Sequence, residues 1–138
     1  MRARIITAIA GSVMLSFVTV LGAQEAPSGE YVQAMTDIRG AAQVLGQFSE
    51  SQDFESASLA AQSAAAAFEH VQKFWEGRDA DAEKLAGLAW KAARDVRVAA
   101  DLSSVEGVDF AAAQMIETCQ SCHDVHREEV SEGTYQIK

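Results

Sequence analysis

FESASLAAQSAAAAFEHVQKFWEG, residues 54–77, places an apolar side chain at every third or fourth position. This series consists of Phe54, Ala57, Ala61, Ala64, Phe68, Val71 and Trp75. The spacing predicts a helix with one buried face, and the run of alanines in its middle has a high helix propensity. Because alanine is small, this face would let a bulky group come close to the helix. Gly77 is a suitable stop signal.

The same periodicity recurs in three other segments, residues 30–49, 82–102 and 108–130. Pro27 is the only proline in the chain, so no proline interrupts these segments. In residues 82–102 the predicted buried series is Leu85, Leu88, Ala92, Val96 and Ala99. Residues 133–138 are expected to be non-helical, and no segment shows the alternation of a strand. Four amphipathic helices joined by short loops predict an all-α protein, an antiparallel four-helix bundle.

Five residues near the end of the last segment read CQSCH, from Cys119 to His123. C-x-x-C-H is the attachment signature of c-type haem. Two thiols three positions apart on one helix face can both reach the vinyl groups of one porphyrin, and the following histidine offers an imidazole to the iron. We therefore predict that Cys119 and Cys122 attach one haem c and that His123 is an iron ligand. A haem would also fill a bundle whose inner faces are rich in alanine.

Two other uses of a C-x-x-C pair stay open at this point. A redox dithiol normally opens a helix after a strand, and no strand is predicted near Cys119. A zinc site needs about four ligands. Within this stretch the sequence offers only the two cysteines, His123 and His126.

Residues 1–23 have the layout of a secretory signal peptide. Two arginines precede a mostly apolar run over residues 5–21, and small residues follow. We predict cleavage after Ala23, which leaves residues 24–138 as one domain in the periplasm. A retained membrane anchor is the alternative, but a run of about 17 residues is short for a spanning helix. Export would suit the cysteine motif, because unprotected exported cysteines oxidise.

The predicted mature chain is strongly acidic. Loss of Arg2 and Arg4 with the signal peptide lowers Lys plus Arg from 11 to 9 against 20 acids, which gives a net charge of −11. This charge argues against nucleic acid or an anionic membrane surface as a partner. It suits a soluble protein that is steered to a basic partner, although solubility alone is the simpler explanation.

An exported four-helix protein with C-x-x-C-H in its last helix resembles cytochrome c prime and its relatives. These relatives include low-spin members in which a methionine of the first helix is the sixth iron ligand. In this family a basic residue follows the histidine at the fourth position, and Arg127 matches it. The resemblance therefore places Arg127 near the haem and makes Met35 the residue facing the iron from the first helix. The family often has an arginine about one turn before that position, where this chain has Tyr31.

The resemblance implies two functions, which differ in the role of Met35. If Met35 and His123 both bind the iron, the protein is a one-electron carrier, and methionine ligation raises its potential. If Met35 only lines the pocket, the protein binds small gases such as nitric oxide or carbon monoxide. We expect the carrier. Its partner would be a redox protein, and a homodimer through the first two helices is a further option common in the family.

The remaining candidates are expected to have structural or surface roles. Met115 is predicted to be a core residue, and Trp75 and Trp90 are predicted to pack in the core or against the haem. His70 is a less favoured sixth ligand than a surface histidine, and His126 is expected to point to solvent or to a haem propionate. No carboxylate pair or nucleophile–base constellation can be read from the sequence, so we assign no catalytic residue and do not expect an enzyme.

Overall fold

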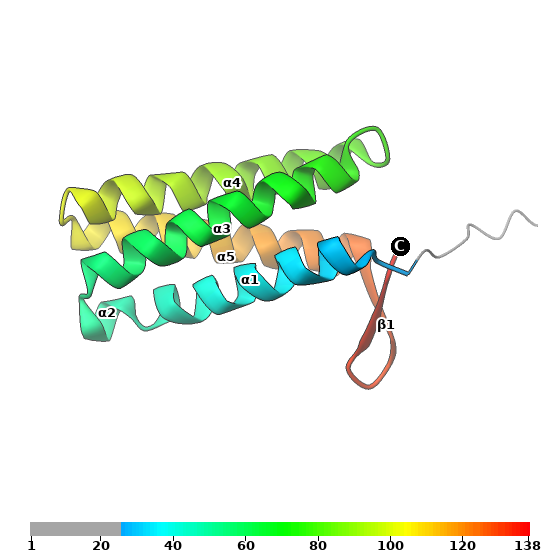
Figure 1. The fold of residues 1–138 in the computed structure, drawn as a ribbon, viewed down its shortest axis with the longest axis horizontal. Helices are drawn as coiled ribbons and strands as arrows, with labels where there is room; N and C mark the ends of the chain where they lie inside the picture. The colour runs from blue at the N-terminus through cyan, green and yellow to red at the C-terminus, as the bar shows by residue number, and fades with distance from the viewer. Residues whose placement is uncertain (1–25) are drawn as a thin grey trace, which may run out of the picture.

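The computed structural model describes residues 26–138, so the predicted signal peptide and its cleavage after Ala23 lie outside the described residues. The elements are α1 (Gly29–Gly46), α2 (Phe48–Ser51), α3 (Phe54–Trp75), α4 (Ala80–Asp101), α5 (Val105–His126), β1 (Arg127–Ser131) and β2 (Thr134–Ile137). Figure 1 shows the four long helices lying side by side, each antiparallel to the next in the chain. The predicted all-α four-helix bundle is therefore confirmed as an architecture.

Each long helix begins where the sequence supplies a capping side chain. Ser28, Asp53, Asp79 and Ser104 each accept a hydrogen bond from a backbone N–H in the first turn of the helix that follows. Such caps satisfy donors that have no partner within the helix. Because every cap lies within a few residues of the predicted start, the order and polarity of the helices follow from local sequence.

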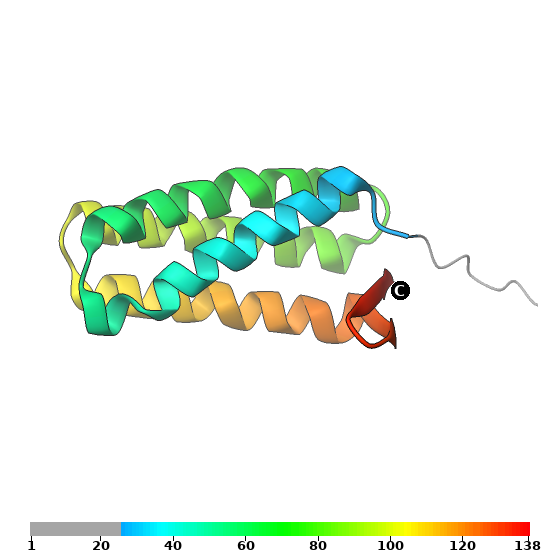
Figure 2. The ribbon, with the colours of Figure 1, turned by 60° about the horizontal axis from the view of Figure 1, so that its bottom comes forward.

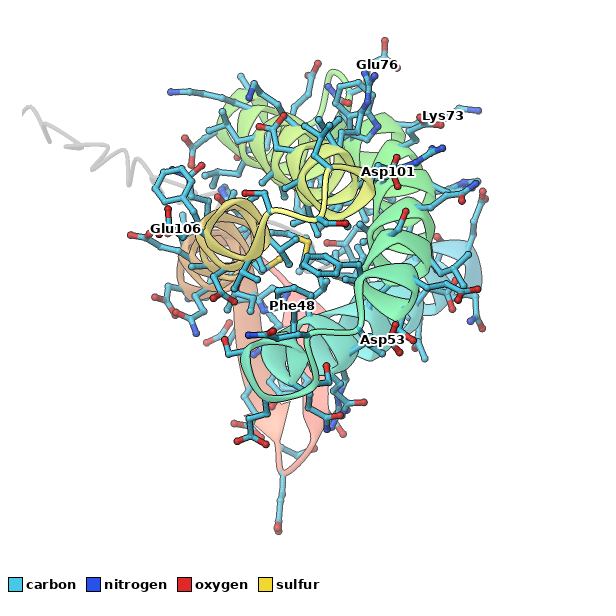
Figure 3. The ribbon with its side chains drawn as sticks, turned by 90° about the vertical axis from the view of Figure 1, so that its left-hand side faces the viewer. Phe48, Asp53, Lys73, Glu76, Asp101 and Glu106 are labelled. Carbon is cyan, nitrogen blue, oxygen red and sulfur yellow. The ribbon has the colours of Figure 1, made fainter. Side chains whose placement is uncertain are left out.

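The core is made mostly of alanine. Of the 24 buried apolar residues in the described chain, 15 are alanine, and the small side chains let α3, α4 and α5 pack closely. Phe48 is 1 % exposed and packs edge-on against Phe54, with ring centroids 5.1 Å apart. Figure 3 shows Phe48 pointing into the bundle from α2, while Lys73, Glu76 and Asp101 lie on its outside. Phe48 thus fills the α2 end of the core.

The helix α1 lies obliquely across the bundle. It packs mainly on α3 and meets α5 at far fewer positions. Figure 2 shows α1 close to α5 at the α2 end and further from it at the end that carries the hairpin. The faces of α1 and α5 therefore diverge toward the last turns of α5, where Cys119, Cys122 and His123 lie.

The C-terminal residues correct two sequence predictions. The last helix ends at His126 rather than near residue 130, and residues 127–137 form an antiparallel hairpin, although no strand was predicted. Gly133 supplies the positive φ of +73° that the turn requires. The hairpin is held to the bundle by half-buried Ile137 and by the Lys138 N–H, which donates to the His126 carbonyl at 3.1 Å. Among residues 26–138, no helix combines the length and the hydrophobicity that a membrane crossing requires.

Two glycines provide a test of how closely the helices pack. A Cβ added at Gly107, in the first turn of α5, would lie 2.9 Å from the Cβ of Ala99 on α4, whereas one added at Gly40 on α1 meets nothing within 4 Å. We expect Gly107→Ala to lower the free energy of unfolding by about 1–3 kcal/mol through overpacking. Gly40→Ala should raise it by about 0.5–1 kcal/mol. Urea unfolding of both variants checks this, and equal changes of the same sign would contradict the described α4–α5 contact.

Candidate cofactor-attachment site at the end of the last helix

The motif residues lie on one face of α5, in its last two turns. Cys119, Cys122 and His123 are each half-buried, and Cys119 packs against the core. Spacings of three and four residues place side chains on the same side of a helix. The two thiols form no disulfide. The structure therefore brings together, on a partly covered face, the three side chains that the sequence predicted to act together.

The surroundings of the two thiols raise their pKa values. Burial raises the pKa of Cys119 to about 11, and the neighbouring Cys122 adds to this shift. Burial also raises the pKa of Cys122, and the charges of Asp81 and Asp79 act in the same direction. Reactive dithiols and thiolate metal ligands depend on a lowered thiol pKa. Neither thiol therefore has the lowered pKa that marks a reactive dithiol.

The His123 imidazole is the least engaged of the three histidines. Within residues 26–138 its ring forms no hydrogen bond or ion pair. Burial lowers the pKa of His123, and the positive charge of Arg127 acts in the same direction while Asp124 opposes it. The neutral imidazole is the form that binds metals. Nowhere in the described chain do three or more His, Cys, Asp or Glu side chains form a group that could hold a metal ion.

The two methionines of interest lie in different environments. Met35 on α1 is half-buried and packs against the edge of the core. Met115 on α5 is fully buried, which confirms the prediction that it is a core residue. Of these two methionines, only Met35 retains exposed surface, and its role as an iron ligand stays a prediction.

The other predicted residues divide between the core and the surface. Trp75 is buried, as expected, and half-buried Trp90 packs against the core while its indole N–H donates to Glu69 at 3.2 Å. His70 is exposed, and its Nδ1 lies 2.9 Å from Glu30 Oε1, in agreement with the surface role expected for it. Arg127 belongs to β1 and stacks on Tyr135, with its guanidinium carbon 4.1 Å from the ring centroid. Its predicted role beside a haem stays a prediction.

The prediction that His126 points to solvent is wrong, because its side chain is only 8 % exposed. The alternative, a contact with a haem propionate, stays a prediction. The Nε2 of His126 lies 3.2 Å from Asp81 Oδ2, and its Nδ1 lies 3.8 Å from Asp79 Oδ2. The reason is tertiary: the start of α4 lies beside the last turn of α5 and places two carboxylates around the ring.

Sequence reasoning placed Tyr31 one turn before Met35 but missed its contacts with α3. The hydroxyl oxygen of Tyr31 accepts a hydrogen bond from the Trp75 indole N–H at 3.3 Å, and the centroids of the Tyr31 and Phe74 rings lie 4.4 Å apart. Burial raises the pKa of Tyr31 to about 12, while the hydrogen bond with Trp75 opposes this shift. The available signal was its position one turn before Met35, which places both residues on one face of α1.

No protein-family model matches this chain, and no curated protein and no solved structure is significantly similar to it. The fold and the site define the class: an all-α four-helix bundle with a C-x-x-C-H motif on the half-buried face of its last helix.

Proposed function

We propose that this protein is an exported, soluble, mono-haem c-type cytochrome of the cytochrome c prime type that carries single electrons. Cys119 and Cys122 attach the haem covalently, and His123 and Met35 bind its iron. The observation that supports this most directly is the trio on α5: two thiols that form no disulfide and an imidazole without a hydrogen-bond partner in the described chain, all half-buried on one helix face.

The residues present fit the chemical requirements of haem c. Attachment needs two thiols and an adjacent imidazole, and an iron–porphyrin needs mostly apolar surroundings. The half-buried Cys119 and Met35 both border a core in which alanine predominates. When bound, the haem supplies one-electron exchange between ferric and ferrous iron. The chain's own part is to hold the group, to supply ligands of fixed type and to limit water.

The choice of ligands decides the function. A histidine and a methionine together close the iron site and raise its reduction potential. A closed site exchanges an electron with little rearrangement, which is what a carrier requires. The net charge of −11 expected for residues 24–138 would favour encounter with a basic redox partner at low salt.

Intact mass and optical spectra test the proposal directly. The full chain is produced with its leader in a bacterial host that attaches haem to C-x-x-C-H motifs. We expect the secreted protein to have the mass of residues 24–138 plus one haem, and its colour to stay with the protein after acid–acetone extraction. The ferric spectrum should be low-spin. A haem-free mass would refute the proposal, whereas a high-spin haem protein that binds carbon monoxide rapidly would replace the carrier with the gas-binding function.

A further inference from the structure

A continuous set of side-chain contacts joins all four long helices at one end of the bundle. Tyr31 of α1 accepts a hydrogen bond from Trp75 of α3, and their rings meet edge-on with centroids 6.3 Å apart. The centroid of the Trp75 ring lies 5.5 Å from the centroid of the His126 ring on α5. His126 in turn contacts Asp81 and Asp79 at the start of α4. We call these five residues the end network.

The carboxylates fix the orientation of the His126 ring. A carboxylate oxygen can only accept a hydrogen bond, so the 3.2 Å contact with Asp81 requires a proton on Nε2. Asp79 is itself held in place, because its Oδ1 accepts the backbone N–H groups of Asp81 and Ala82 as the cap of α4. The backbone carbonyl of His126 accepts from Lys138 at the end of the hairpin. His126 is therefore held through both its ring and its backbone.

The end network lies where α1 and α5 otherwise have little to hold them together. These two helices make few direct contacts, and Figure 2 shows them diverging toward this end. Alanine-rich packing joins α3 to α4 and α4 to α5, but α1 rests mainly on α3. The path from Tyr31 through Trp75 to His126 thus provides a side-chain connection between α1 and α5 at the hairpin end.

Both ends of this path lie next to the proposed iron ligands. Tyr31 precedes Met35 by four residues on one face of α1, and His126 follows His123 by three residues on one face of α5. A shift of Tyr31 therefore moves the helix turn that carries Met35, and a shift of His126 moves the turn that carries His123.

We propose that the end network is a positioning device that sets the separation of α1 and α5 and thereby holds Met35 opposite His123. This inference rests on the proposed function, because it assigns a purpose to the network only if both residues bind the iron. None of the five residues is a proposed iron ligand. They act by positioning Met35 and His123.

Two conservative variants of the holoprotein test this proposal. Tyr31→Phe removes only the hydroxyl and keeps the ring packed on Phe74, and His126→Gln removes the ring between the two carboxylates. Matched controls are Tyr135→Phe on the hairpin and His70→Gln, which breaks an exposed histidine–carboxylate pair between α3 and α1. The readouts are the low-spin fraction of the ferric protein, the rate of carbon monoxide binding and amide hydrogen exchange in the first two turns of α1.

We expect Tyr31→Phe to speed carbon monoxide binding about fivefold, the factor that corresponds to one hydrogen bond, and His126→Gln to have a larger effect. Both should lower the low-spin fraction and the protection of the α1 amides, while the two controls match the wild type. The double variant should show less than the product of the single effects, because both residues act through one path.

Three results would overturn the inference while leaving the proposed function in place. The first is that the network variants behave like their controls in all readouts. The second is that they lower the melting temperature without changing spin state or carbon monoxide binding, which would mean a merely structural role. The third is that Tyr31→Phe changes nothing where His126→Gln fails to fold. A wild type without covalent haem would instead refute the proposed function, and unchanged α1 exchange in the variants would then separately refute the connection between α1 and α5.

Discussion

Replacing both Cys119 and Cys122 by alanine will abolish covalent haem, while Ser121→Ala between them will leave it intact. The two thiols are the only cysteines of the chain, so no other side chain can form the thioether links. Ser121 is a matched control within the motif, because it is exposed and its hydroxyl donates to the Glu117 carbonyl at 2.9 Å. The check is intact mass together with retention of colour after acid–acetone extraction.

Each single variant and His123→Ala should show graded effects. Cys119→Ala or Cys122→Ala leaves one link and should weaken attachment, whereas His123→Ala removes the proposed iron ligand and should abolish the native spectrum. Haem that remains bound at wild-type level in the double cysteine variant would exclude thioether attachment. If Ser121→Ala also lost haem, a general folding defect rather than loss of the thiols would explain the results.

The helices of the fold could be predicted because their signals are local. Caps such as Asp53 and Asp79 and the three-four spacing of apolar residues fix where helices begin and that one face is buried. The face itself was less well predicted. Leu88 was placed in the buried series of α4, yet it is 47 % exposed, and Ala86 and Ala89 are buried in its place. Because α4 packs against both α3 and α5, close approach favours its alanine face over its leucine positions.

The hairpin after α5 gave too weak a signal to be predicted. Its strands have five and four residues, both are largely exposed, and three glutamates in residues 128–132 do not favour a strand. What stabilises it is tertiary or cross-strand: Arg127 stacks on Tyr135, and Ile137 packs on the core. Such contacts form only once the bundle has placed the end of α5, so no window of sequence reveals them.

For the candidate site, too, the local features could be predicted from the sequence and the tertiary contacts could not. The motif trio could be assigned to one face of the last helix because its spacing is local. The contacts of His126 with Asp81 and of Trp75 with Tyr31 join residues 45 and 44 positions apart, and pairing at that distance depends on how the helices meet. Periodicity marks a residue as inward-facing but does not identify its partner.

The role of Met35 is decided by replacing it with leucine and comparing the result with Met115→Leu. Leucine keeps most of the side-chain volume, so packing changes should cost less than about 1.5 kcal/mol at either position. It removes the thioether sulfur, and this sulfur is a better ligand for ferrous iron than for ferric iron. We expect Met35→Leu to turn the ferric protein high-spin, to remove the weak far-red sulfur-to-iron band, to lower the reduction potential and to open the protein to carbon monoxide. Met115→Leu should change none of these, because Met115 is fully buried in the core and has no proposed contact with the iron.

The measurements are the ferric spectrum, a redox titration and carbon monoxide binding kinetics. If Met35→Leu keeps the wild-type spectrum and potential, Met35 only lines the pocket. In that case a wild type that is already high-spin would be a binder of small gases rather than a carrier of electrons.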